Sequence, residues 1–258
     1  MNFDELIERR GTHSDKWDRM ETLYGVPSAD GIPMWGADMD FHPPTSVQRA
    51  LEKMLAHGVY GYFGDDRDYL SAIRWWMETR HGWKVEAPWI FTTHGLVNGT
   101  ALCVDAFTQP GDGIVLMTPV YHAFARVIKA AGRRVVDCNL VVENGRYVPD
   151  FAAWDAQVTR SERMMMLCSP HNPGGRVWTA GELRGIADFC KRHDLILVSD
   201  EIHHDLVYPG AKHLPTAVAA PHLGDPLGAV TAPPKTFNIA GGPSRNRLLA
   251  DAPPRQLF

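Results

Sequence analysis

Short apolar runs recur along this chain, with helix-like segments between them. They read WIFTT at 89–93, GIVLMT at 113–118, RVVDC at 134–138, MMMLCS at 164–169, LILVSD at 195–200 and GAVTA at 228–232. Strands that are apolar throughout are typical of a parallel sheet buried on both faces, and the helical segments between them favour that arrangement. The pattern predicts an α/β fold with a mostly parallel sheet flanked by helices. RLLA at 247–250 could supply one last strand, making about seven.

Helical segments begin and end at recognisable residues. TSVQRALEKMLAH follows Pro43-Pro44 and ends at Gly58, and a second amphipathic stretch runs from Tyr69 to about Arg80 before Gly82. In TAGELRGIADFCKRH, Thr179 and Glu182 have the spacing of a capping box. The first 45 or so residues are polar, and we expect them to be irregular.

Composition excludes several classes of protein. The 258 residues suffice for one large domain, or one domain and part of another, and the net charge of −4 gives no basic field for nucleic acid or anionic lipid. No apolar stretch of about 18 residues predicts a membrane span, and the charged N-terminus does not resemble a secretory signal. The 4 cysteines are scattered, so we expect reduced, buried thiols in a cytoplasmic protein rather than disulfides or zinc.

Polar or unusual residues follow the predicted strands, at the end where parallel sheets bind ligands. Gly95, Leu96 and Val97 join the first strand to a helix, and free N–H groups there could hold a phosphate. An ordinary glycine turn is the better interpretation of that segment alone. Tyr121, after the second strand, could stack on a flat ring, although core or rim packing is more common for such a tyrosine.

Two further strand ends carry stronger signals. Asn172 lies in SPHNPGG, a turn made rigid by prolines and glycines, where its amide could bind a ring oxygen or form a structural Asx-turn. Asp200 directly follows an apolar strand, so its burial requires a partner such as a pyridinium nitrogen. A metal site formed with Glu201, His203 and His204 is the rival. We expect no metal, because adjacent residues point in different directions and no HxH or HxxxH spacing occurs. His203 could equally be a hydrogen-bonded core histidine.

Lys235 follows the last apolar run through Pro233-Pro234. Most lysines are solvated, but a lysine partly desolvated at a strand end can have a lowered pKa and form a Schiff base. We therefore interpret Lys235 as the residue that carries a carbonyl cofactor.

The order of glycine turn, aromatic, NPGG, strand aspartate and strand lysine resembles that of fold-type-I pyridoxal phosphate (PLP) enzymes, the aspartate aminotransferase superfamily. The strings SDKWD, PMWGADMDF, YGYFGDD, SPHNPGGRVW, SDEIHHDLVY and KTFNIAG are similar to those of its cystathionine β-lyase branch, the MalY/PatB-type C–S lyases. The likeness runs from about Arg10 to Gly241.

The resemblance implies pyridoxal 5'-phosphate as cofactor and a role for each strand-end residue. Lys235 would carry the cofactor and move the Cα proton, and Asp200 would pair with the pyridine nitrogen. Asn172 would bind the 3'-oxygen with help from His203, and Tyr121 would stack on the ring.

The resemblance also implies contacts with the phosphate, the substrate and a second subunit. Gly95, Leu96 and Val97 would contact the phosphate through their backbone. Tyr62 would reach the phosphate of a neighbouring subunit, which implies a homodimer. Asp38 and Met39 would lie near the substrate entrance.

The implied reaction is α,β-elimination of L-cystathionine or a related cysteine S-conjugate to a thiol, pyruvate and ammonia. A class I/II aminotransferase, or an inactive remnant or binding subunit, is the alternative. Residues 1–45 would form an N-terminal arm and part of a small domain, and 46–258 the PLP-binding large domain. Relatives continue into a further domain and have serines where Pro233-Pro234 stand, so we expect a truncated chain with an incomplete small domain, in which Thr231 is the nearest hydroxyl before Lys235.

Overall fold

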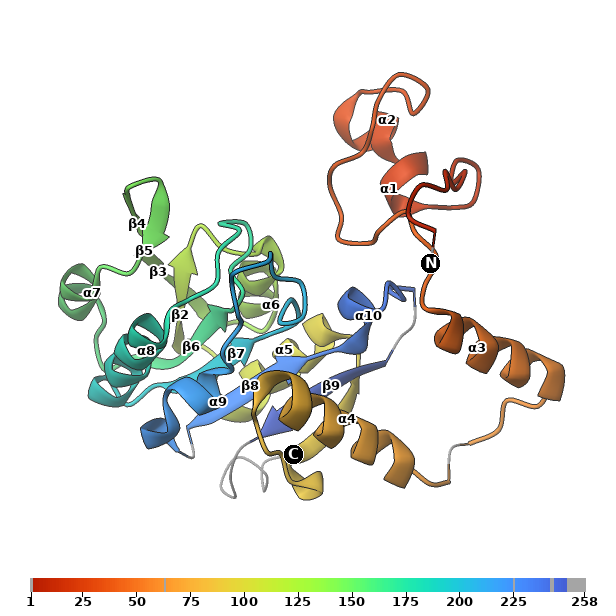
Figure 1. Ribbon diagram of the computed structural model, residues 1–258. Helices are drawn as coiled ribbons and strands as arrows, with labels where there is room; N and C mark the ends of the chain where they lie inside the picture. The colour runs from red at the N-terminus through yellow and green to blue at the C-terminus, as the bar shows by residue number, and fades with distance from the viewer. Residues whose placement is uncertain (1, 63, 225, 242–243, 250–258) are drawn as a thin grey trace. The chain divides into compact units, whose positions relative to one another are not determined.

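The computed structural model describes residues 2–62, 64–224, 226–241 and 244–249, the last range as backbone only (Figure 1). The chain divides into two compact units. Met1–Tyr62 and Pro234–Gly242 form the first, here the N-terminal unit. Phe63–Pro233 and Pro243–Phe258 form the second, here the sheet unit. The domain boundary expected at residue 45 stays a prediction.

The sheet unit contains a seven-stranded sheet in the order β1-β9-β8-β7-β6-β2-β3. All neighbours from β8 to β3 are parallel, whereas β9 lies antiparallel between β8 and β1. The predicted mostly parallel sheet is therefore confirmed. The strands are β1 Ile90–His94, β2 Gly113–Thr118, β3 Arg134–Asn139, β6 Glu162–Cys168, β7 Ile196–Asp200, β8 Leu227–Thr231 and β9 Ser244–Leu249.

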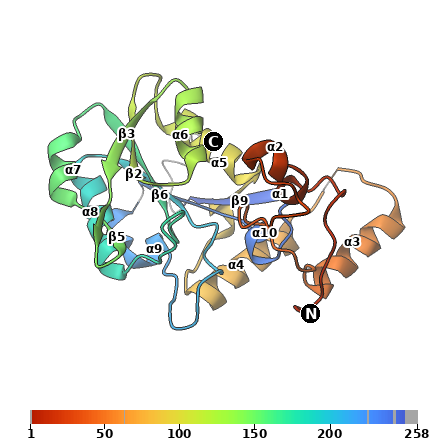
Figure 2. The ribbon, with the colours of Figure 1, turned by 90° about the horizontal axis from the view of Figure 1, so that it is seen from above.

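Helices cover both faces of this sheet, as Figures 1 and 2 show. Helices α5 (Leu96–Phe107) and α6 (His122–Ala130) pack on one face. Helices α7 (Phe151–Gln157), α8 (Ala180–Arg192) and α9 (Thr216–Ala219) pack on the other. Helix α4 (Arg67–His81) packs through a separate apolar cluster that includes Ala229 of β8.

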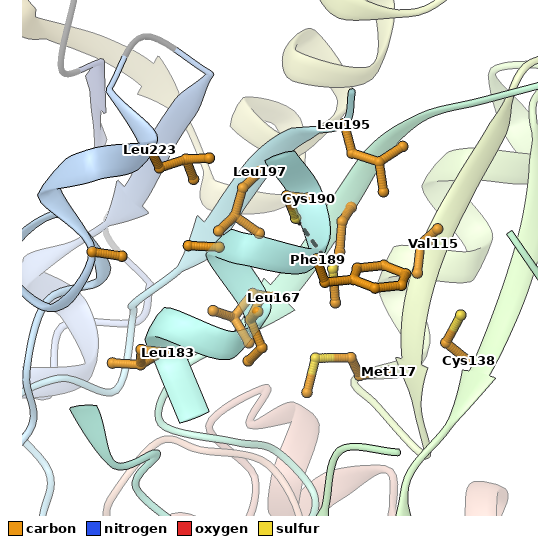
Figure 3. Packing of buried hydrophobic residues seen from close by; sticks show 14 of the residues in the cluster. Val115, Met117, Cys138, Leu167, Leu183, Phe189, Cys190, Leu195, Leu197 and Leu223 are labelled. Atoms are coloured by element: carbon orange, nitrogen blue, oxygen red, sulfur yellow. Dashed lines mark hydrogen bonds between the residues drawn. The ribbon is translucent and has the colours of Figure 1, made fainter. Parts of the chain in front are cut away.

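Burial on both faces explains why the central strands β2, β6, β7 and β8 read as apolar. In β2, Ile114 and Leu116 face the α5 and α6 cluster, while Val115 and Met117 face the α7 and α8 cluster. Figure 3 shows the ring of Phe189 reaching from α8 toward Val115. Each such side chain, once buried, contributes about 1.5–3 kcal/mol to folding. This two-sided core fixes the strand ends where the candidate site residues lie.

The predicted element boundaries agree closely with the structure, and the Thr179–Glu182 capping box is confirmed. The sequence analysis missed the hairpin of β4 (Val141–Glu143) and β5 (Arg146–Val148). Its turn residues, Asn144 and Gly145, have φ values of 50° and 75°. An Asn-Gly pair with both φ angles positive forms the tight hairpin turn that matches strand twist, so the signal was present in the sequence. Two short 3-10 turns, Ala87–Trp89 and Pro221–Leu223, complete the unit.

The N-terminal unit contains α1 (Asp15–Asp18), α2 (Met20–Tyr24) and α3 (Thr45–His57), and α10 (Pro233–Thr236) leads into its second segment. The first two helices lie where we expected irregular structure. Both are too short to show apolar periodicity. The Ser14 side chain caps α1 by accepting from the N–H of Trp17, and Gly25 ends α2 at a φ of 70°.

Two composition-based expectations can be compared with the described residues. The 4 cysteines, Cys103, Cys138, Cys168 and Cys190, are buried free thiols, as predicted. Among the helices in the described ranges, none combines the length and apolar character needed to cross a membrane.

Candidate active site

Six strands of the sheet unit, β1, β2, β3, β6, β7 and β8, run in the same direction and end at one edge. Because β9 is antiparallel to both neighbours, β1 runs parallel to β8, and therefore parallel to β7, β6 and β2. Gly95, Tyr121, Asn172 and Asp200 follow or end β1, β2, β6 and β7 in that order. The topology thus brings these predicted residues to the carboxyl edge, where open α/β sheets bind ligands. Their roles stay predictions.

Asp200 is the most buried carboxylate among these predicted residues. It is 4% exposed, and its Oδ1 accepts a hydrogen bond from the N–H of Ile202 at 3.0 Å. Its carbonyl accepts from the N–H of Ser169 at 2.8 Å, which ties the end of β7 to the start of the Asn172 turn. A carboxylate buried in this way favours a cationic or N–H-bearing partner, as a protonated pyridine nitrogen would be.

The thiol of Cys168 holds the Asn172 turn through two hydrogen bonds. Cys168 Sγ donates to the carbonyl of Pro170 at 3.4 Å and accepts from the N–H of Asn172 at 3.3 Å. Burial, and then the charge of Asp200, raise the pKa of Cys168, so the thiol stays protonated. The turn is therefore fixed through its backbone, while the Asn172 side chain lies at a half-buried position.

The N-terminus of α5 forms a potential anion site at the same edge. Gly95 is the N-cap residue at a φ of 85°, and no side chain caps the helix. A Cβ added at Gly95 would meet nothing within 4 Å among the described atoms, so the positive φ, not crowding, favours glycine here. The first N–H groups of a helix have no intrahelical acceptor, and with the helix dipole they suit a phosphate.

Tyr121 and His203 also lie in the sheet unit, both half-buried. Tyr121 is the N-cap residue of α6, and its ring packs against Phe124 with centroids 5.8 Å apart. His203 follows β7 and lines a cavity of about 530 Å³ with residues of the Asn172 turn. The Tyr121 ring thus has the packing role that the sequence allowed as an alternative, and the cofactor roles of both residues stay predictions.

In the N-terminal unit, Lys235 lies beside the predicted substrate residues. Its Nζ donates to the carbonyl of Ala37 at 3.3 Å. Asn238 binds the same segment, because its Oδ1 accepts from the N–H of Met39 at 2.8 Å and its Nδ2 donates to the Met39 carbonyl at 2.9 Å. Lys235, Asp38 and Met39 line one cavity of about 600 Å³.

Asp38 and its neighbour Asp40 are held by cations at this cavity. Arg9 bonds to Asp38 Oδ2 at 2.6 Å and also to Asp40, while Lys16 Nζ lies 2.8 Å from Asp40 Oδ2. Burial raises the pKa of Asp40, but hydrogen bonds from Lys16, Trp17 and Arg9 outweigh it and hold that pKa below its usual range. The cavity that contains Lys235 therefore has two cation-paired carboxylates in its wall, of which Asp40 is held ionised.

Tyr62 ends the first segment of the N-terminal unit, and its side chain is fully exposed. It is thus available to contact another molecule, and its predicted reach to a neighbouring subunit stays a prediction.

Comparison with known proteins identifies the family. The aminotransferase class I and II family matches residues 37–242. The chain belongs to this family.

Three relatives show how far the likeness extends. Cystathionine beta-lyase PatB of Bacillus subtilis is 40% identical over 100% of this chain and 66% of its own length. A PLP-bound putative aminotransferase from Clostridium difficile has a TM-score of 0.94 at 35% identity, covering 99% of this chain and 66% of the other. Cystalysin from Treponema denticola, whose crystal structure contains a pyridoxal 5'-phosphate cofactor, has a TM-score of 0.92 at 37% identity, with coverage of 98% and 65%. The chain thus spans just under two thirds of the length of the proteins it matches.

Two residues that organise the candidate site, Asn238 and Arg9, were not singled out from the sequence. Asn238 was part of the quoted string KTFN but was given no task, and it holds residues 39–41 through their backbone. Arg9 pairs with both carboxylates of the ADMD segment. Neither long-range contact can be recognised from neighbouring residues in the sequence. However, the two carboxylates of Asp38 and Asp40, with no cation close in sequence, could have prompted a search for one.

His171, next to Asn172, is expected to make the free energy of unfolding of this chain depend on pH. Burial and then the positive charge of Arg176 lower the pKa of His171 to about 4. In the unfolded chain the ring takes up a proton near its ordinary pKa of about 6.5. Between these values only the unfolded chain gains the proton, so the free energy of unfolding falls as pH decreases, by at most about 1.4 kcal/mol per pH unit.

Urea unfolding at several pH values between 4 and 7 checks this prediction. His171→Gln is expected to show a shallower loss of stability over that range than the wild type. His222→Gln is the matched control, since His222 is 37% exposed and paired with Asp188. Equal slopes in all three proteins would contradict the assignment to His171.

Proposed function

We propose that this chain is a PLP-dependent C–S lyase, or the cofactor-binding part of one. It would catalyse α,β-elimination of L-cystathionine or a related cysteine S-conjugate, with one water consumed and a thiol, pyruvate and ammonia released. The observation that carries the proposal is the position of Asp200. This buried carboxylate lies beside the Asn172 turn, at the carboxyl edge of the mostly parallel sheet. The 40% identity to a cystathionine beta-lyase over 100% of this chain favours the lyase outcome.

The residues at the sheet edge fit a phosphorylated pyridine cofactor. Bound pyridoxal phosphate would supply an electron sink for negative charge at Cα of the substrate. Asp200 would keep the ring nitrogen protonated, Asn172 would donate its amide to the 3'-oxygen with His203 assisting, and Tyr121 would stack on the ring face. The uncapped N-terminus of α5, from Gly95, would bind the phosphate.

The N-terminal unit would supply the group that moves the proton. Lys235 would hold the cofactor covalently, then remove the Cα proton after the substrate amine replaces it. Asp38 and Met39 line the cavity that contains Lys235, and we propose that substrate passes them.

The assay compares two reactions on the purified chain supplied with pyridoxal phosphate. Pyruvate release from L-cystathionine is the expected result, with little amino transfer to 2-oxoglutarate. Asp200→Asn is expected to lower the rate of pyruvate release by about 10²–10⁴-fold, the usual size of a proton-placement effect. Asp188→Asn, on the exposed surface of α8 and paired with His222, is the control expected to be unchanged.

A class I/II aminotransferase is the second candidate, and the 0.94 TM-score to a PLP-bound putative aminotransferase favours it. Amino transfer that exceeds pyruvate release would establish it. Failure to bind the cofactor, with a folded chain, would instead indicate the third reading, an inactive remnant or binding subunit.

We further propose that the chain forms a homodimer. Helix α3 buries none of its residues, and Leu51, Met54 and Leu55 on it are 57%, 50% and 72% exposed. An apolar helix surface of this kind favours a protein partner, and we propose a second copy for it. Sedimentation analysis that finds only monomers over a wide concentration range would contradict the dimer. The cytoplasmic location remains a prediction from sequence.

A further inference from the structure

A cluster of imidazole and carboxylate groups lies in the sheet unit, apart from the residues assigned above. His81 is the last residue of α4, and His204 and Asp205 follow β7. Nε2 of His81 lies 2.9 Å from Asp205 Oδ1, and Nε2 of His204 lies 2.9 Å from Asp205 Oδ2. All three side chains are 3–6% exposed. One potential ligand atom from each lies within 4.8 Å of the others.

This arrangement matches a first-row transition-metal site in ligand type and spacing. Two imidazoles and one carboxylate are a common ligand set for Zn²⁺, which binds them at about 2.0–2.2 Å. Ligand atoms around a tetrahedral ion of that size lie about 3.4 Å apart. The 2.9 Å contacts would open by about 0.5 Å around such an ion, and the other separations, all within 4.8 Å, would adjust toward the same value, with loss of the two Nε2 protons.

Neighbouring groups already orient the three side chains. Thr231 Oγ1 lies 2.8 Å from Nδ1 of His204, so its hydroxyl can accept a proton held on Nδ1 and leave Nε2 bare. Trp76 Nε1 donates to Asp205 Oδ2 at 3.0 Å. Metal-binding histidines and carboxylates are typically fixed by a second layer of hydrogen bonds of this kind. Thr231, the nearest hydroxyl before Lys235, is thus hydrogen-bonded to His204.

A third buried imidazole supplies an independent observation. His213 is 1% exposed, and its Nε2 lies 3.1 Å from Glu201 Oε2. A carboxylate only accepts, so Nε2 carries the hydrogen and Nδ1 presents a lone pair. That Nδ1 is buried and has no hydrogen-bond partner among the described residues. His213 lines the same cavity of about 240 Å³ as the three ligand candidates, so a donor such as a metal-bound water would satisfy it.

We propose that His81, His204 and Asp205 bind a divalent transition-metal ion, with Zn²⁺ the best match, and that a water on the ion donates to His213. No metal was expected from the residues after β7, because neighbours there point in different directions. The fold brings His81 to Asp205 across 124 positions of sequence. The site does not depend on the proposed lyase function.

Metal content of the wild-type chain gives the primary test. The untagged protein is stripped with a chelator, dialysed against Zn²⁺ and analysed for bound metal, and Co²⁺ is then used as a spectroscopic probe. We expect one tightly bound ion per chain and the intense visible absorption of four-coordinate Co²⁺. A wild-type chain that retains no Zn²⁺ after removal of free metal would overturn the proposal.

Variants locate the ion. His204→Ser removes a ligand and is expected to weaken Zn²⁺ binding by more than about 100-fold, because loss of an outer hydrogen bond alone costs about 10–100-fold. Thr231→Val, which removes only the outer hydroxyl, is expected to fall in that lower range, and it carries the test if His204→Ser does not fold. His222→Gln, an exposed histidine paired with Asp188, should bind as the wild type does. Unchanged affinity in His204→Ser would mean that the ion binds elsewhere and would refute the site.

Discussion

Lys235→Ala is expected to abolish covalent attachment of pyridoxal phosphate and to lower any C–S lyase activity by about 10²–10⁴-fold, the contribution of a positioned proton-transfer group. The reason is chemical: an amine is needed both to hold the carbonyl of the cofactor and to accept the Cα proton. In the structure this amine lines a cavity of about 600 Å³ with Asp38 and Met39.

Borohydride reduction followed by peptide mass mapping measures the attachment directly. The wild-type chain should carry the cofactor mass on the peptide that contains Lys235, and the variant should carry none. Lys129→Ala is the matched control, since Lys129 is exposed in the last turn of α6. Labelling of several lysines in proportion to their exposure, with none favoured, would contradict the assignment of Lys235.

Glu201→Ala is expected to lower the free energy of unfolding by about 3–5 kcal/mol, because three buried donors lose their acceptor at about 1–3 kcal/mol each. Glu201 is 1% exposed. Its Oε1 accepts from the N–H of Thr216 at 2.9 Å and from Ser199 Oγ at 3.0 Å, and its Oε2 lies 3.1 Å from His213 Nε2. Alanine would remove the acceptor that these three buried donors share.

Urea unfolding with matched variants checks the size and the origin of this effect. Glu143→Ala, on the exposed hairpin strand β4, should change stability by less than about 0.5 kcal/mol. The double variant of Glu201 and His213 should lose less than the sum of the two single losses, because the two groups contact each other. A loss below about 1 kcal/mol in Glu201→Ala would show that the carboxylate is not essential to the fold.

The direction of the Glu201 pKa adds a pH dependence to this effect. Burial raises that pKa, but the hydrogen bond from His213 and the bonds from Thr216 outweigh it, so the pKa lies below its usual range. The folded chain therefore holds this carboxylate ionised at pH values where the unfolded chain has begun to protonate it. Its stabilising contribution is complete above the usual glutamate pKa and is lost as pH falls toward the lowered value.

The sheet and its strand-end residues could be predicted because their signals are local. A buried parallel strand must be apolar along its length, and a polar residue at its end stands out, as Asp200 does after LILVS. The glycines that end α3 and α4, at φ values near 70°, likewise mark their boundaries without reference to the rest of the chain.

The missed features depend on contacts between distant parts of the sequence. His81 reads as an ordinary residue near the end of a helix, and only its pairing with Asp205 shows it to be buried beside a carboxylate. The short helices α1 and α2 offer too few residues for a periodic pattern. Asn238 looks like a turn residue, and its φ of 52° agrees, yet its side chain binds backbone 199 positions away.

That last contact has a consequence for synthesis. The segment around Met39 emerges from the ribosome long before Asn238, and the two are separated by 199 residues. At about 5–20 residues per second, the early segment waits about 10–40 s for its partner. The N-terminal unit therefore completes this hydrogen bonding only after Asn238 has been made, although most of its residues come before residue 63. Until then the N–H of Met39 and the carbonyls of Met39 and Phe41 lack the side-chain amide that binds them in the folded chain.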